Sequence, residues 1–430
     1  MRAFTSRTLL ALTLAACTGS AALAADAPAA AASQPAVSPA FAAPFNAAQE
    51  MLKAGNGVGA LAKLKEVAAL PNLTPYEQYL IVRVRAPAEY TANDNVAAAA
   101  DFEVLLASDQ LPAVDKLVIL KALASVQYSA EQYPKAAVTL QRYFDAGGDD
   151  AQLHDLLPQV QYMNKDYAAA AKNFRAQIDA TYAAGKVPAE RTLRLLASSY
   201  SQANDDTSYL WALEHLAVAY PKNADYWKEL VARVVHTEKF ADRLYVDNYR
   251  LKAQVLGNVS DGERLSYAAL ADHAGYPEEA KRVLDDAFAS AHPFTGPDLA
   301  EANKLRAAVS KSVASDKAQE SINLNAANAA KDGNALFSLG LLKVVDGNAN
   351  GGLEMMQQAM AKGGLRNPEE ARLHLGYAQV KAGRDAEAVK TFQSITSGPN
   401  GIVPMAHVWA LYAQSRAQAA APVAAAAASK

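Results

Sequence analysis

The sequence predicts an all-α fold, a solenoid of antiparallel helix hairpins. It matches itself at a fixed offset, because Tyr133, Ala136 and Leu140 recur 34 residues later as Tyr167, Ala170 and Phe174. Apolar residues also recur three and four places apart in short segments, which is the spacing of one helix face. No stretch alternates polar and apolar residues over the length of a strand. A fixed period of this size indicates repeat units that stack on their neighbours.

The repeated positions form a packing code. A small residue lets the two helices of a hairpin approach closely, and an apolar residue four places on fills the space beside it. In this spacing, the chain resembles tetratricopeptide (TPR) repeat proteins over about residues 45–412. The resemblance implies a right-handed superhelical solenoid at 44–331, followed by a C-terminal TPR pair at 332–412.

Prolines mark several expected helix boundaries. Pro134 and Pro277 each follow a tyrosine where the second helix of a hairpin should begin. In the first turn of a helix the backbone N–H has no intrahelical partner, so proline, which has no N–H, loses no hydrogen bond there. Pro158 falls where a first helix should be in mid-course, which predicts either a late helix start or a kink. The polar stretch 297–331 fills the repeat positions poorly, so we expect a weak hairpin there, at a seam before the last pair.

The first 24 residues are typical of a secretory signal peptide. Arg2 and Arg7 supply the positive charge, a short apolar core follows, and Ala22-Leu23-Ala24 is a small-x-small cleavage site. These features predict export to the periplasm.

Cys17 is the only cysteine, and it ends a lipobox-like run, Leu14-Ala15-Ala16-Cys17. Cleavage after Ala24 would leave a mature chain without cysteine, which excludes disulfides and a Cys nucleophile. The alternative is lipidation of Cys17, which would make the protein an outer-membrane lipoprotein.

Two flanking segments are rich in alanine and contain proline. Residues 25–43 are expected to form a disordered linker, and residues 413–430 a disordered tail.

Charge excludes some classes of partner. The formal net charge is −3, from 41 basic and 44 acidic residues, without a long run of one sign. A basic stripe would indicate nucleic acid or an anionic membrane, so neither is expected as a partner. No apolar run long enough to span a membrane follows the N-terminal segment.

No pattern of catalytic or metal-binding residues is found. None of the seven histidines has the HExxH spacing of zinc proteases. Neither a phosphate-binding glycine loop nor a GxSxG nucleophile turn occurs. Two carboxylates converging across a cleft, as in glycosidases, remain an open alternative. We expect a non-enzymatic protein with no catalytic residue, no cofactor and no metal.

The TPR resemblance implies that a partner binds on the inner face formed by the first helix of each hairpin. Transferring that register gives eight candidate groove residues: Lys121, Tyr128, Tyr162, Arg191, Arg194, Ser201, Phe337 and Tyr377. Tyrosine and arginine are enriched in protein-binding hot spots. The alternative is that each tyrosine is half-buried packing whose hydroxyl reaches water.

The second half of the chain carries a narrower resemblance. Its motifs are YWKEL at 226–230, AGYPEEA at 274–280, LG pairs at 339–340 and 375–376, AKGGLRNP at 361–368 and WALY at 409–412. Their order is similar to that in TPR proteins that accompany TonB–ExbB–ExbD energy transducers in Gram-negative bacteria. The resemblance implies a periplasmic scaffold that binds an envelope protein or peptide, such as TonB, ExbB or ExbD, as an accessory to TonB-dependent transport.

Two other functions stay open. The same repeats occur in cell-envelope assembly and exopolysaccharide-export factors. A more remote alternative is a helical peptidoglycan-active enzyme, which would need a further catalytic domain with an acidic residue.

Overall fold

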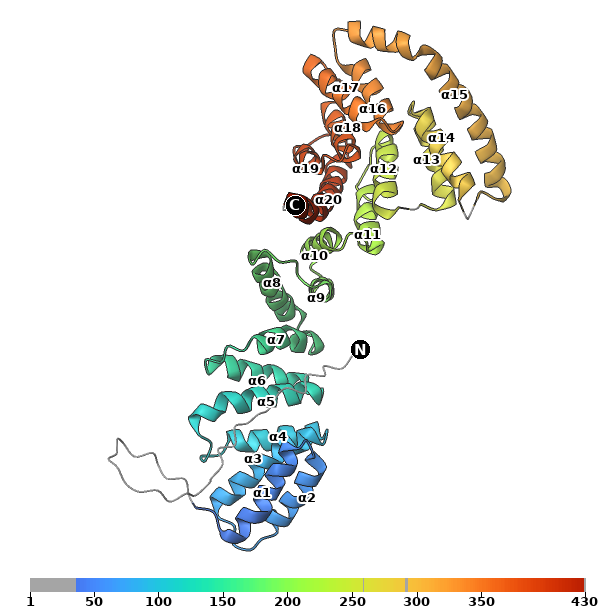
Figure 1. Ribbon diagram of the computed structural model, residues 1–430. Helices are drawn as coiled ribbons and strands as arrows, with labels where there is room; N and C mark the ends of the chain where they lie inside the picture. Colours follow the sequence, from blue (N-terminus) through green and yellow to red (C-terminus); the bar gives the residue numbers. More distant parts are fainter. Residues whose placement is uncertain (1–35, 258, 291–292, 429–430) are drawn as a thin grey trace. The chain divides into compact units, whose positions relative to one another are not determined.

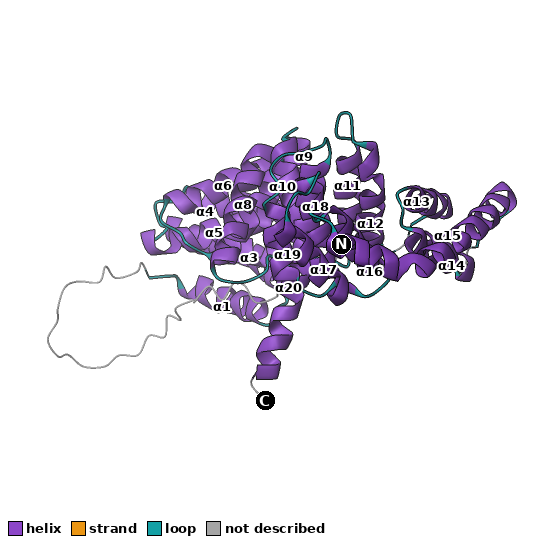
Figure 2. Ribbon diagram, turned by 90° about the horizontal axis from the view of Figure 1, so that it is seen from above, coloured by secondary structure: helices purple, strands orange, loops and turns teal. Residues whose placement is uncertain are grey.

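The computed structural model describes residues 36–257, 259–290 and 293–428 of the 430-residue chain. The expected signal peptide and Cys17 lie outside these residues. The described part consists of α-helices, two short 3-10 helices and connecting loops, without a strand, as Figure 2 shows. The predicted all-α fold is confirmed. In this part of the chain, no helix combines the length and the apolar character needed to cross a membrane.

The described chain divides into two compact units. The first unit ends at Ala180 and also takes Gln202–Asn204; the second unit takes Thr181–Ser201 and the chain from Asp205 onward. The helices of the first unit are α1 (Pro39–Lys53), α2 (Gly57–Ala68), α3 (Pro75–Thr91), α4 (Asn95–Leu106), η1 (Ala113–Asp115), α5 (Lys116–Ser129), α6 (Tyr133–Asp145), α7 (Ala151–Met163) and most of α8 (Tyr167–Ala183).

The second unit holds the remaining helices, shown from green to red in Figure 1. They are α9 (Glu190–Gln202), α10 (Asp206–Ala219), α11 (Ala224–Val235), η2 (Asp242–Leu244), α12 (Tyr245–Leu256), α13 (Asp261–His273), α14 (Pro277–Ala289), α15 (Gly296–Ala329), α16 (Asn334–Val345), α17 (Ala349–Lys362), α18 (Pro368–Lys381), α19 (Asp385–Gln393) and α20 (Ile402–Ala428).

Among the helices of residues 36–257, 259–290 and 293–428, eight pairs are joined by the same three-residue turn. Its middle residue is left-handed in every case, with φ from 57° to 99°: Gly55, Asn93, Glu131, Lys165, Asn204, Gly275, Gly347 and Gly383. In five of these turns the third residue is an Asn or Asp whose side chain accepts a backbone N–H of the second helix: Asn56, Asp94, Asp166, Asp205 and Asn348. This cap satisfies an otherwise unpaired donor and fixes where the second helix begins.

The core of the first unit is built in overlapping layers. Helix α3 places Ile81 against α1 and α2, and Tyr79 against α4 and α5. Helix α5 likewise places Leu123 in the layer with α3 and α4, and Leu120 in the next layer with α6 and α7. Each first helix therefore contributes to two successive layers, which is the packing of a stacked repeat array.

The small residues of the packing code are buried as predicted. Ala136 and Ala170 are both 0% exposed. The LG pairs have the same function in the second unit. A Cβ atom added to Gly340 on α16 would lie 2.8 Å from the carbonyl oxygen of Gly352 on α17, and one added to Gly376 would lie 2.5 Å from the Phe392 ring. These glycines permit close helix contact.

Pro158 lies inside α7, which begins at Ala151. Proline has no N–H to donate to the carbonyl four residues earlier, that of His154. This carbonyl accepts a hydrogen bond from Nε2 of Gln177 on α8 at 2.7 Å. The neighbouring helix therefore supplies the donor that the proline removes.

The larger core of the second unit joins helices that are far apart in sequence. It contains Leu213 of α10, Trp227 of α11, Leu251 of α12, Phe337 of α16 and Trp409 of α20. Helix α20 packs against α10, α11 and α12, so the end of the chain returns to the start of this unit (Figure 1). The expected boundary between 44–331 and 332–412 does not separate two cores, because this core takes side chains from both segments.

The stretch 297–331 does not form the expected hairpin. It lies almost entirely within α15, a single 34-residue helix that packs against α13, α14 and α16 (Figure 1). No glycine occurs between Gly296 and Gly333, and no proline after Pro297, so nothing supplies the left-handed turn residue. Alanine, lysine and glutamine favour continuous helix instead.

The described ends are more ordered than the composition suggested. Helix α1 begins at Pro39, inside the expected 25–43 linker, because Phe41 is 0% exposed in the first core layer. Helix α20 continues through the expected tail to Ala428, and Ala413 is 0% exposed. Alanine has the highest helix propensity of all residues, so an Ala-rich segment continues a helix that packing has started.

Candidate functional site

The eight candidate groove residues differ in burial and are divided between the two units. Three of them, Lys121, Tyr128 and Tyr162, are half-buried in the first unit. Arg191, Arg194 and Ser201 are exposed on α9, in the second unit. Phe337 and Tyr377 are buried in the larger core of the second unit.

The Lys121 side chain forms an ion pair within the protein. Its ammonium on α5 donates to Oδ2 of Asp150, the N-cap residue of α7. Burial opposes ionisation of Asp150, but the hydrogen bond and charge of Lys121 outweigh it, so the pKa of this carboxyl is lowered. The pair therefore ties two first helices together.

Tyr128 and Tyr162 occupy the same place in successive hairpins. Tyr128 meets the ring of Tyr133 edge-on at 5.8 Å, and Tyr162 meets the ring of Tyr167 edge-on at 5.5 Å. Each pair brackets the left-handed turn of its hairpin, so both tyrosines have a packing function. Because both remain half-buried, part of each side chain is also accessible to a partner.

A polar contact that a glutamine side chain accepts, buried in the first case and part-buried in the second, repeats at the same offset. Gln127 accepts from the Thr139 hydroxyl at 2.7 Å, and 34 residues later Gln161 accepts from the Asn173 amide at 2.8 Å. The repeat therefore conserves polar packing between its two helices as well as apolar packing.

The start of α9 is held by tyrosine hydroxyls. Tyr220 donates to the Pro188 carbonyl at 2.7 Å, and Tyr226 donates to Glu190 Oε1 at 2.6 Å. Burial, together with Glu190, raises the pKa of Tyr226 to about 12, so it stays a donor at any physiological pH. These bonds fix the register of the helix that exposes Arg194.

Placing Phe337 and Tyr377 in a groove was wrong. Phe337 is 7% exposed and Tyr377 is 5% exposed. The ring of Tyr377 meets Trp409 of α20 edge-on at 5.6 Å. The transferred register assumed that α16 and α18 have an open inner face, but the core closed by α20 covers these residues.

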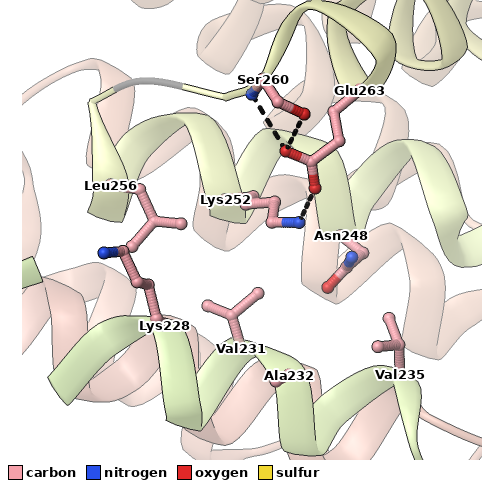
Figure 3. A pocket seen from close by; sticks show the side chains of 9 residues that line it. All are labelled: Lys228, Val231, Ala232, Val235, Asn248, Lys252, Leu256, Ser260 and Glu263. Atoms are coloured by element: carbon pink, nitrogen blue, oxygen red, sulfur yellow. Dashed lines mark hydrogen bonds and ion pairs between the residues drawn. The ribbon is translucent and has the colours of Figure 1, made fainter. Parts of the chain in front are cut away.

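A cavity of about 440 Å³ lies between α11 and α12, with the start of α13 at its edge (Figure 3). Apolar side chains and a few polar groups line it: Lys228, Val231, Ala232, Val235, Asn248, Lys252, Leu256, Ser260 and Glu263. Its volume is in the range of small-ligand and peptide-anchor pockets. Sequence analysis missed this cavity, because lysine, valine and asparagine at helical spacing are typical of any half-exposed helix.

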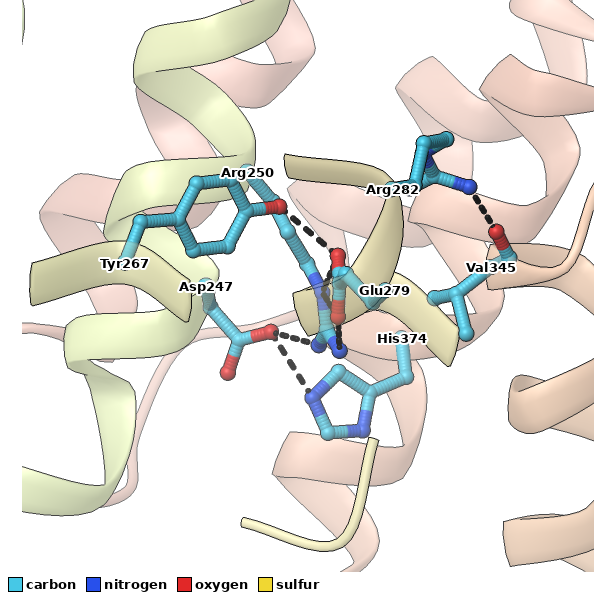
Figure 4. Close-up of polar contacts among 7 residues, drawn as sticks. All are labelled: Asp247, Arg250, Tyr267, Glu279, Arg282, Val345 and His374. Atoms are coloured by element: carbon cyan, nitrogen blue, oxygen red, sulfur yellow. Dashed lines mark hydrogen bonds and ion pairs between the residues drawn. The ribbon is translucent and has the colours of Figure 1, made fainter. Parts of the chain in front are cut away.

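A buried ionic network lies beside the larger core (Figure 4). Arg250 on α12 donates to Glu279 on α14, at 2.6 Å to Oε2, and to Asp247 at 2.8 Å. Glu279 also accepts from the Tyr267 hydroxyl at 2.7 Å. Asp247 lies 3.0 Å from Nε2 of His374 on α18, 127 residues further along the chain.

The network keeps its charges paired. Burial raises the pKa of Asp247, but the charges of His374 and Arg250 outweigh this effect and lower it to about 2. Burial, with nearby Glu279, raises the pKa of Tyr377 to about 12. Since every described charge here has a partner, the network is a structural element that ties α12, α14 and α18 together.

Within the described part of the chain, no three His, Cys, Asp or Glu side chains are grouped so that they could hold a metal ion. His154 pairs with Asp149 and His407 pairs with Glu214, each at the surface, and His374 belongs to the buried network with Asp247.

The chain was compared with known proteins. No protein-family model and no curated protein matches it. Among solved structures, it is similar to a tetratricopeptide repeat protein from Parabacteroides merdae, with 11% identity, a TM-score of 0.32, and coverage of 80% of this chain and 100% of that one.

Two further solved structures are similar, with an equal and a lower TM-score. The Naa15/Naa10 complex bound to HypK-THB gives 13% identity and a TM-score of 0.32, over 82% of this chain and 63% of that one. The P58(IPK) TPR domain gives 9% identity and a TM-score of 0.23, over 89% of this chain and 99% of that one. Because these identities and TM-scores are low, the assignment of helix hairpins is based on the helices and turns of this chain and not on the similar structures.

Proposed function

We propose that this chain is a non-enzymatic scaffold that binds a protein partner in the bacterial envelope. The observation that carries the proposal is the repeated hairpin, with the same left-handed turn in eight helix pairs. Stacked hairpins present rows of helix surface on which contacts from successive repeats add together. The half-buried Tyr128 and Tyr162, at equal places in successive hairpins, are contacts of this kind.

The finer proposal is a periplasmic accessory of a TonB–ExbB–ExbD system. Its support is the order of motifs from YWKEL at 226–230 to WALY at 409–412, together with the secretory pattern of residues 1–24. Cleavage after Ala24 predicts a mature chain that begins at Ala25. Intact-mass analysis of the protein from the envelope tests this, since a chain that begins with an acylated Cys17 would place it at the outer membrane.

The partner is tested by crosslinking in cells, followed by purification of this chain and mass spectrometry. Recovery of TonB, ExbB or ExbD supports the proposal. Recovery of exopolysaccharide-export or envelope-assembly proteins would instead support the alternative scaffold function.

The surface involved is tested by substitution. Replacing Tyr162 and Arg194 together with alanine should weaken partner capture at least tenfold, a change of about 1.4 kcal/mol. The matched control is Lys311→Ala, which removes an exposed cation on α15 of the second unit, away from the cavity between α11 and α12. If the double variant captures the partner as well as the natural chain does, the binding surface does not include these two positions.

A further inference from the structure

Asn248, in the cavity between α11 and α12, is a buried polar side chain whose carbonyl oxygen has no partner among the described residues. It is 6% exposed, and its Oδ1 is enclosed and accepts no hydrogen bond from the described residues. Figure 3 shows its carboxamide projecting from α12 toward the α11 side chains. An unpaired buried amide costs about 1–3 kcal/mol relative to a paired one. A ligand that pairs with this carboxamide inside the cavity would offset that cost, and among the residues that line the cavity only Asn248 has such an unpaired buried oxygen.

The charged groups around the cavity already have partners. Lys252 pairs with Glu263, and Glu263 accepts from the Ser260 backbone N–H at 3.0 Å and from its hydroxyl at 2.9 Å. On the rim, Lys228 pairs with Asp225 at 3.0 Å. A ligand that enters this cavity therefore needs no charge of its own.

The remaining lining is apolar. Val231 and Val235 on α11 and Leu256 on α12 form the walls. A complementary ligand thus combines an apolar group with one neutral group that both donates and accepts a hydrogen bond. A polypeptide backbone amide beside an apolar side chain has this composition, and a carboxamide pairs with it through both of its atoms.

We propose that this cavity binds a short uncharged segment of the partner polypeptide. On binding, the Asn248 carboxamide rotates so that its enclosed Oδ1 faces the cavity and accepts from one backbone N–H of the segment. Its Nδ2 then donates to the neighbouring carbonyl, and an apolar side chain of the segment contacts Val231, Val235 and Leu256. The inference rests on the proposed scaffold function and assigns the partner's anchor to the second unit.

The test uses the purified full chain and a defined probe, the blocked tripeptide acetyl-Ala-Leu-Ala-amide. The side-chain NH₂ signal of Asn248 is followed by ¹⁵N NMR during titration. The expected result is a saturable shift of this signal. Three ester analogues, each with one backbone N–H replaced by oxygen, remove one donor at a time, and one of them should bind at least tenfold more weakly.

Substitution adds a second arm. Asn248→Leu should abolish tripeptide binding while the melting temperature stays equal or rises, because an unpaired polar group is removed. Asn325→Leu, the same change at an exposed position on α15, should leave binding unaltered.

Three results would overturn the proposal: no saturable shift with the wild-type chain, equal binding of all three esters, or normal binding by folded Asn248→Leu. The ester series needs no variant, so the test holds even if that variant misfolds. Should the tripeptide fail to bind while crosslinking still recovers a partner, the scaffold function stands and only the cavity assignment fails. Crosslinking that recovers no partner would count against the scaffold function itself.

Discussion

Arg250 shows how much of the second unit depends on single residues. Its guanidinium is 2% exposed and satisfies two carboxylates, of which Glu279 is 0% exposed and Asp247 is 8% exposed. A buried ion network of this kind contributes little net stability compared with apolar packing, but removing one of its members strongly destabilises the fold, because the remaining charges are left unpaired. It also fixes which helices meet, because Asp247 contacts His374 across 127 residues.

Replacing Arg250 with methionine should therefore destabilise the second unit by about 3–5 kcal/mol, since two buried carboxylates lose their counter-charge. Urea unfolding monitored by tryptophan fluorescence measures the change. Arg233→Met is the matched control, because Arg233 pairs with the exposed Asp206 and the half-exposed Glu229 and should cost less than about 1 kcal/mol. Equal losses in the two variants would contradict a structural role for the network.

Asp247 gives the network a defined pH dependence. Its pKa is about 2 in the folded chain, below the ordinary value of 3.8. A lowered folded pKa contributes stability that is present above pH 3.8 and is lost as the pH falls from 3.8 toward 2. Asp247→Asn should thus cost about 2 kcal/mol at pH 6 and clearly less at pH 2.5. Urea midpoints at the two pH values measure this, and a cost that does not change with pH would show that the ionised carboxylate is not what stabilises the fold.

At the scale of the helix, α7 and α8 illustrate how a hairpin tolerates a proline. Pro158 leaves the His154 carbonyl without its helical donor, and Gln177 supplies one from the neighbouring helix. The proline and the glutamine therefore form one unit, and the two positions should be energetically coupled.

A double-mutant cycle measures this coupling. Gln177→Ala should cost about 1 kcal/mol in the natural chain, because it leaves a helix carbonyl unpaired. In a Pro158→Ala background the same change should cost little, since residue 158 then donates its own N–H to His154. The readout is the thermal unfolding of the four variants, and additive effects would mean that the Gln177 bond does not compensate for the proline.

For the whole molecule, the decisive contact is the return of α20 to α10, α11 and α12. Trp409 and Met405 are nearly or fully buried in the core that this contact closes. Without α20, the apolar faces of α11, α18 and α19 would lie open to solvent.

A chain ending at Gly401 should lose the cooperative unfolding of the second unit, because truncating a single buried tryptophan already costs about 3–5 kcal/mol. The first unit has its own core layers and should keep its transition. A chain ending at Gln418 retains Trp409 and Ala413 and serves as the control. Calorimetry resolves the two units, and an intact second transition in the shorter chain would show that α20 is dispensable.

The sequence by itself determined the local features of this protein. The 34-residue offset of Tyr133, Ala136 and Leu140 and the prolines that mark the starts of α6 and α14, Pro134 and Pro277, could be read from the sequence. Each of these depends on residues a few places apart, whose spacing fixes which helix face is apolar and where a helix can begin. The all-α fold and the buried alanines followed from them.

Only the tertiary structure decided how the helices of the second unit pack against one another. Three features depend on which helices pack together: the burial of Phe337 and Tyr377, the Asp247–His374 contact and the cavity at Asn248. The spacing of residues along one helix does not predict which other helix it will contact. His407 and Glu214 are 193 residues apart, and no sequence pattern predicts that they pair. Distant helices associate wherever their apolar surfaces fit together, so this protein's repeats were readable one hairpin at a time, and the closure of its second unit was not.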